Sequence, residues 1–228
     1  PVDLTRFAWL AIAAAVLTIA LKTIAWQITG SVGLLSDAAE SVVNLVAAIV
    51  ALVALRVAIM PADKNHHFGH SKAEYFSAAA EGQMIFVAAI FIIWTAIERF
   101  LNPRPLEDVG IGLAISVIAS ILNGSVALVL MRAGREHNSL TLTADGKHLL
   151  TDVWTSAGVQ RLDAVVAALV GLNIIWTGWK LLQESSAGLM DAALPEEQSA
   201  EIARVIGTFS SPEVSFHGLR TRLSGHRG

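Results

Sequence analysis

Six long apolar segments dominate the chain, and short polar or proline-containing stretches separate them. Each segment has at least 20 residues, which is about the length that an α-helix needs to cross the hydrocarbon core of a membrane. The segments are residues 7–28, 32–59, 75–100, 109–131, 140–159 and 163–183. The pattern therefore predicts an all-α membrane protein with six transmembrane helices.

The fifth segment fits this pattern least well, because its first half is polar. Only Val153 to Val159 continues as an apolar run, and seven helical residues rise only about 10 Å. The predicted connection to the sixth segment is also short, since it consists of Gln160, Arg161 and Leu162. We expect either a short, tilted fifth helix or a sequence that lacks residues between Val159 and Gln160.

The last part of the chain is more polar than the rest. Residues 194–206 have the composition of a capped helix, and residues 214–223 could form a strand. Fewer than about 40 residues are too few for an independent domain. We therefore expect a six-helix transmembrane domain over residues 1–191 and the beginning of an incomplete cytoplasmic domain over residues 192–228.

Lysine and arginine are distributed unevenly between the predicted loops. Arg56, Lys64 and Lys72 flank the second loop, and Arg132 and Arg135 follow the fourth segment. By the positive-inside rule these two loops lie in the cytoplasm. Six spans then place both termini in the cytoplasm, and the compact loops favour a bacterial plasma membrane.

The composition agrees with a membrane protein and restricts its chemistry. Hydrophobic residues make up 54% of the chain and charged residues 15%, whereas a typical soluble domain has about 25% charged residues. The chain has no cysteine, so any metal must be held by nitrogen and oxygen. The net charge of −3 is too small to indicate a nucleic-acid partner.

Two predicted helices carry polar stripes inside their apolar segments. The stripes are Asp37, Glu40 and Asn44 in the second segment, and Asp145, His148 and Asp152 in the fifth. Both have the spacing i, i+3, i+7, which places three side chains on one face of a helix. An ionised residue in a membrane costs at least about 2.5 kcal/mol on insertion scales, and a metal ion or shared protons would offset that cost.

The second loop concentrates histidine and acid within eight residues, namely Asp63, His66, His67 and His70. Such a cluster either belongs to a solvated loop or binds a metal ion. The residues alone leave both interpretations open.

Four motifs in the chain resemble those of the cation diffusion facilitators. They are residues 30–37 (GSVGLLSD), 66–74 (HHFGHSKAE), 144–152 (ADGKHLLTD) and 189–195 (LMDAALP). The resemblance implies export of divalent metals in exchange for protons. It also implies six transmembrane helices followed by a cytoplasmic α+β domain that helps to form a homodimer, and this sequence looks truncated within that domain.

The resemblance also implies a set of site residues. The transport site would use Glu40 and Asn44 together with His148 and Asp152, although the family usually has Asp or His at the first of these positions and Asp at the second. Asp37 and Asp145 could be extra ligands, supporting partners or proton carriers. The remaining matches are a loop metal site at Asp63, His66 and His70 with His67 as a spare imidazole, a charge pair between Lys72 and Asp191, and a ligand position at His217 whose partners would lie beyond Gly228.

Asn44 leaves the identity of the metal open, because a neutral amide gives the site one negative charge fewer than a carboxylate would. Zinc is the first expectation, with iron, manganese, cobalt and cadmium as further possibilities. The expected mechanism is alternating access. The alternatives are an intramembrane metal-dependent hydrolase, for which the expected His-Glu-x-x-His motif is missing, a passive cation channel and a purely structural bundle.

Overall fold

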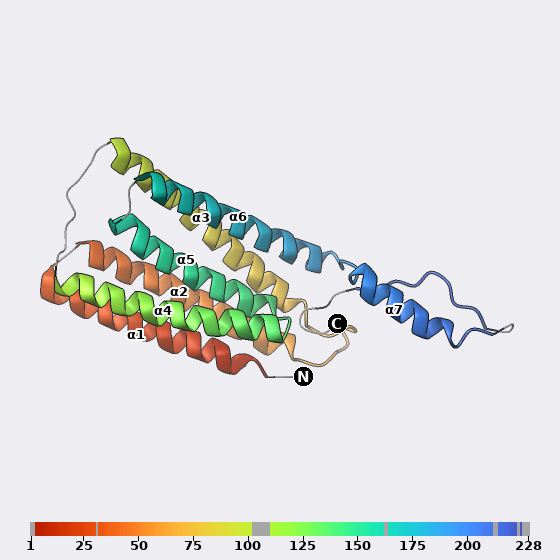
Figure 1. Ribbon diagram of the computed structural model, residues 1–228. Helices are drawn as coiled ribbons and strands as arrows, with labels where there is room; N and C mark the ends of the chain where they lie inside the picture. Colours follow the sequence, from red (N-terminus) through yellow and green to blue (C-terminus); the bar gives the residue numbers. More distant parts are fainter. Residues whose placement is uncertain are drawn as a thin grey trace.

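The computed structural model describes residues 3–30, 32–101, 110–161, 164–211, 214–222 and 224. Six long helices lie side by side in a bundle, and a shorter seventh helix lies beyond one end of it (Figure 1). The helices are α1 (Thr5–Thr29), α2 (Val32–Ala58), α3 (Ala73–Leu101), α4 (Ile111–Glu136), α5 (Leu140–Arg161), α6 (Ala164–Leu189) and α7 (Glu196–Gly207). The prediction of a mostly helical protein is thus confirmed.

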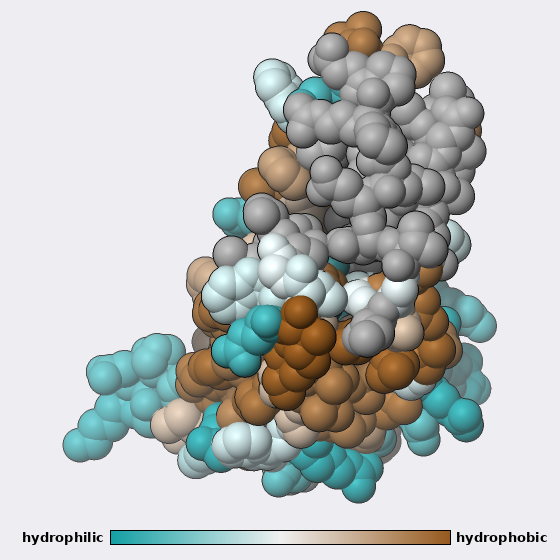
Figure 2. Space-filling view, turned by 90° about the vertical axis from the view of Figure 1, so that its left-hand side faces the viewer, coloured by the Kyte–Doolittle hydropathy of each residue, from teal (hydrophilic) through white to brown (hydrophobic). Residues whose placement is uncertain are grey.

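Four helices in the described part of the chain are long and apolar enough to cross a membrane. These spans are Thr5–Thr29, Asp37–Ala58, Ala73–Trp94 and Gly112–Glu136, in α1 to α4. Large apolar side chains such as Phe91 and Trp94 of α3 are exposed on the outside of the bundle, as expected where lipid replaces water. Apolar residues also cover much of the described surface in Figure 2, which shows the left-hand end of Figure 1. The six-span topology stays a prediction.

Helix α5 occupies a central position, because it packs against α2, α3, α4 and α6. One apolar cluster joins α5 to α1, α2 and α4, and a second joins it to α3 and α6. A Cβ atom at Gly146 of α5 would lie 2.9 Å from the carbonyl oxygen of Ala127 of α4, so the glycine permits a close approach of these helices. The neighbouring helices therefore shield the polar residues of α5 from lipid.

Helix α5 is two residues longer than the predicted segment 140–159 and is the shortest of the six long helices. Helix α5 contains 22 residues and continues to Arg161, so at 1.5 Å per residue it is about 33 Å long. Gln160 and Arg161 belong to the helix and not to the connection, which is why the length was underestimated. Leu162 and Asp163 lie outside the described residues.

In its described residues, the segment after α6 forms a helix but no strand. Asp191 has a positive φ of 58°, and α7 follows with no buried residue. The predicted strand from residue 214 is wrong for the described residues 214–222, where only Val214 forms an isolated bridge, to Ser211. A strand needs a neighbouring strand for its hydrogen bonds, and no such neighbour is present in the described ranges.

Candidate metal centre

Helices α2 and α5 bring the two polar stripes together inside the bundle. Asn44 of α2 and His148 and Asp152 of α5 are all buried, with exposed fractions of 3–5%. Nε2 of His148 lies 3.2 Å from Oδ1 of Asn44, and the side chain of Asn44 also forms a hydrogen bond with Asp152. Glu40, one turn before Asn44, is partly buried and interacts electrostatically with Asp152.

The contact between Asn44 and His148 determines which ring nitrogen is available to a metal. An amide oxygen can only accept, so Nε2 of His148 donates the hydrogen and Nδ1 keeps its lone pair. Nδ1 of His148 and Oδ2 of Asp152 are buried, and neither has a hydrogen-bond partner among the residues that the structure describes. Because buried polar atoms are normally paired, this arrangement fits a cation-binding site.

The other acid of each stripe lies close to this centre. Asp145 is 1% exposed, interacts electrostatically with His148, and has an oxygen, Oδ2, without a partner in the described structure. Asp37 is partly buried, and its backbone carbonyl oxygen accepts hydrogen bonds from Lys22 and Ser41. Asp37 thus interacts electrostatically with Glu40, and Asp145 with His148.

A second group of ligand atoms lies in the loop between α2 and α3. One ligand atom each of Asp63, His66 and His70 lies within 4.8 Å of the other two. Oδ1 of Asp63 is 3.1 Å from Nδ1 of His66, and its Oδ2 is 3.6 Å from Nε2 of His70. Backbone amides of His66 and Asn65 donate hydrogen bonds to Asp63 and hold its pKa below the usual value. The carboxylate is thus available to a cation at neutral pH.

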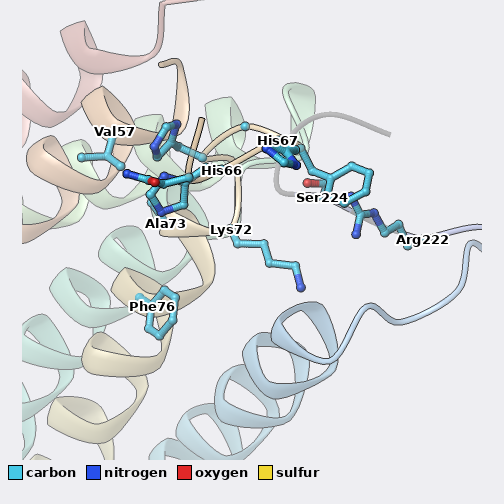
Figure 3. A pocket seen from close by; sticks show the side chains of 12 residues that line it. Val57, His66, His67, Lys72, Ala73, Phe76, Arg222 and Ser224 are labelled. Atoms are coloured by element: carbon cyan, nitrogen blue, oxygen red, sulfur yellow. The ribbon is translucent and has the colours of Figure 1, made fainter. Parts of the chain in front are cut away.

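His67 does not belong to this group of three ligand atoms. It lines a cavity of about 640 Å³ that His66, His70 and Arg222 of the C-terminal segment also border. In Figure 3 its side chain lies near Ser224 and away from that of His66. The structure therefore brings Asp63, His66 and His70 together but not His67.

The comparisons with known proteins agree with this geometry. Residues 8–190 match the family described as the cation efflux transmembrane domain. The chain is 50% identical to the uncharacterized transporter sll1263 of Synechocystis sp., over 96% of this chain and 74% of that protein. It is 33% identical to the cation-efflux pump FieF of two Escherichia coli strains, over 97% of this chain and 77% of each pump. The chain belongs to the cation efflux family. The resemblance to the cation diffusion facilitators is thereby confirmed, and the substrate class of this cation efflux protein is divalent metal cations.

In this cation efflux protein a cluster of charged contacts joins the residue before α3, the segment just after α6 and the C-terminal segment. Nζ of Lys72 lies 3.0 Å from Oδ1 of Asp191 and donates a hydrogen bond to the carbonyl oxygen of Leu189. Arg222 lies 3.3 Å from the same Asp191 oxygen, and its guanidinium group stacks over the ring of Phe68. The hydrogen bond from Lys72 is the main reason that the pKa of Asp191 is below the usual value.

His217 lies in the C-terminal segment, away from both groups of ligand atoms. It is exposed and lines a small cavity with residues that follow α7. Among the described residues it belongs to no group of three potential metal ligands. The predicted ligand role of His217 stays a prediction.

Two buried charged residues near the centre were not identified from the sequence. Lys22 of α1 is 5% exposed and interacts electrostatically with Glu40 and Asp152. Glu81 of α3 is fully buried, accepts a hydrogen bond from Ser77 and interacts with Asp145. The sequence signal was the same for both residues, namely a charge inside an apolar segment.

Proposed function

We propose that this cation efflux protein is a secondary active transporter that exports a divalent metal ion in exchange for protons. The observation that carries the proposal is the pair of unpartnered ligand atoms, Nδ1 of His148 and Oδ2 of Asp152, buried between α2 and α5. Buried unpaired polar groups are costly, so a ligand that binds both atoms would stabilise this arrangement. A metal ion that binds and leaves would satisfy them for part of the transport cycle.

The exchange with protons follows from the chemistry of the proposed ligands. A metal ion binds neutral imidazole and ionised carboxylate, so loading displaces protons from these groups. Protons that arrive from the other side of the membrane would then compete with the metal and favour its release. Alternating access would result if the helices that carry the two stripes move relative to the other helices.

The proposed transport site consists of Glu40, His148 and Asp152, with Asn44 as a fourth ligand or as the partner that orients His148. A hydrogen-bond partner that does not bind the metal ion itself can fix the ring orientation of a metal-binding histidine. Asp37 and Asp145 would support the site electrostatically. A site with oxygen and nitrogen ligands and few negative charges suits zinc first, and also iron, manganese, cobalt or cadmium.

The rest of the proposed architecture agrees with the charges along the chain. We place six spans in the plasma membrane with both termini in the cytoplasm, because the α2–α3 loop and the end of α4 are rich in lysine and arginine. Asp63, His66 and His70 would form a second metal site on that side, and the contact between Lys72 and Asp191 would hold α3 against α6. A homodimer and a cytoplasmic domain that begins at about residue 192 complete the proposal.

Equilibrium zinc binding to the purified protein tests the two sites separately. Asp152→Ala should remove the buried site and leave the loop site intact. Asp63→Asn keeps an oxygen for the backbone hydrogen bonds of the loop but removes the charge of a proposed ligand, so it should abolish zinc binding at the loop site only. Lys180→Gln is a suitable control, because Lys180 is exposed on α6 and pairs with Glu184. Unchanged zinc stoichiometry in Asp152→Ala would contradict the site assignment.

A further inference from the structure

Lys22 places an ammonium group beside the proposed transport site from a helix that supplies none of the ligands. Its side chain is buried between α1 and α2 with an exposed fraction of 5%. Nζ donates a hydrogen bond of 3.2 Å to the carbonyl oxygen of Asp37. Asp37 lies three residues before Glu40, so the ammonium group is fixed one turn from the first proposed ligand.

The charge of Lys22 acts directly on the proposed ligands. The ammonium group interacts electrostatically with the carboxylates of both Glu40 and Asp152, which belong to different helices. A buried ammonium group is costly unless opposite charge compensates it. The same two carboxylates would therefore have to compensate the charge of both Lys22 and a bound metal ion.

We infer that Lys22 is a built-in competitor of the transported metal ion, whose positive charge lowers the affinity of the transport site and speeds release. This inference rests on the proposed function. With Glu40 and Asp152 ionised the ligands carry two negative charges, and Lys22 offsets one of them. Asn44 adds no charge, so the proposed ligands and Lys22 together carry a net charge of only minus one. A low affinity suits a site that must release its ion in every transport cycle.

The alternative role for Lys22 is purely structural, as the hydrogen-bond donor that joins α1 to the carbonyl of Asp37. Lys22→Gln separates the two roles, because the glutamine amide is still a donor but has no charge. Lys22→Arg keeps the charge. Both variants are made in the Asp63→Asn background, so that the loop site does not contribute to the binding curve, and Lys180→Gln is the matched control for loss of a lysine.

Zinc binding to the full-length purified protein at constant pH is the first measurement. Removing one unit of repulsion at close range in a buried site should tighten binding by about tenfold or more in Lys22→Gln. Lys22→Arg and Lys180→Gln should both stay within about threefold of the parent. In transport assays, Lys22→Gln should lower KM and also kcat, since the metal ion leaves more slowly.

Several results would overturn the inference. Affinity within threefold of the parent in Lys22→Gln would show that the charge does not act on the site, and weaker binding would show that Lys22 only supports its structure. If Lys22→Gln does not give a folded protein, the zinc affinity of the double variant Lys22→Gln/Glu40→Gln, which loses one positive and one negative charge, is compared with that of Glu40→Gln alone. Tenfold tighter binding by the double variant supports the inference, and equal binding refutes it.

The proposed function is tested in the same experiment by a different variant. If the parent binds zinc at the buried site and Asp152→Ala does not, the transport site stands whatever the Lys22 variants do. If Asp152→Ala binds zinc like the parent, the proposed site itself is wrong. Failure of the inference and failure of the proposed function are thereby distinguished.

Discussion

Substitution of Asn44 tests whether this residue orients His148 or binds the metal ion itself. In the structure, Oδ1 of Asn44 accepts a hydrogen bond of 3.2 Å from Nε2 of His148, and Nδ1 remains available. Asn44→Ala removes that bond and leaves the ring unoriented. Loss of such a partner typically weakens metal binding by about 10- to 100-fold, which corresponds to about 1.4–2.7 kcal/mol.

Asn44→Asp should have the opposite effect, because the carboxylate still accepts from Nε2 and adds a negative charge. A metal ion on Nδ1 would lie about 6–7 Å from the oxygen of residue 44, since the metal–nitrogen bond, the ring and the hydrogen bond all separate them. At an effective dielectric constant of about 20, a unit charge and a dication at that distance attract by roughly 5 kcal/mol. Part of this attraction is offset because a buried carboxylate takes up a proton that the metal ion must displace, so we expect a net gain of about 1–2 kcal/mol, or roughly tenfold tighter binding.

Zinc titration of the purified protein at constant pH measures both effects. Asn123→Ala is the matched control, because Asn123 of α4 is equally buried but belongs to neither stripe. If Asn44 is a direct ligand, Asn44→Ala should cost more than about 100-fold. The orienting role is refuted if Asn44→Ala binds zinc within threefold of the parent protein.

Two further predictions concern contacts outside the buried centre. A Cβ atom at Gly188 of α6 would overlap the buried ring of Tyr75 of α3. Gly188→Ala should therefore destabilise the protein by about 1–3 kcal/mol and lower its thermal midpoint in detergent. Gly207→Ala is the control, because a Cβ atom there would have no atom within 4 Å, and equal midpoints for the two variants would contradict the packing. The pKa of Asp191 is held below 3.8, mainly by Lys72, so the contribution of this pair is present above pH 3.8 and is lost as the pH falls through the lower folded-state pKa. Carboxyl NMR should give a midpoint for Asp191 below 3.8 that returns toward 3.8 in Lys72→Ala, and a midpoint at or above 3.8 in the parent would be inconsistent with the contact.

The helices could be predicted from the sequence because a membrane span satisfies its backbone hydrogen bonds within the segment, so an apolar run of sufficient length defines it. Helix α5 was the exception, since His148 and Asp152 lower its hydropathy although its neighbours bury them. The strand from residue 214 was predicted wrongly, because a strand depends on a distant partner that local composition does not reveal.

The spacing of the stripes placed Asn44, His148 and Asp152 on defined helix faces, but it did not show how the two faces meet. The hydrogen bond between Asn44 and His148 depends on how α2 packs against α5. Lys22 was not identified from the sequence, because nothing in the first apolar segment shows that α1 packs against α2 at the level of Asp37. The ligand types were thus accessible from the sequence, and the charge that surrounds them was not.

Metal uptake into proteoliposomes with an imposed pH gradient tests the central claim most directly. The account predicts saturable uptake of zinc, or of iron, manganese, cobalt or cadmium, that depends on the gradient and is abolished by Asp152→Ala although the variant remains folded. Lys180→Gln should transport like the parent. Uptake that persists in Asp152→Ala, or that neither saturates nor responds to the gradient, would contradict a proton-coupled carrier with its site between α2 and α5.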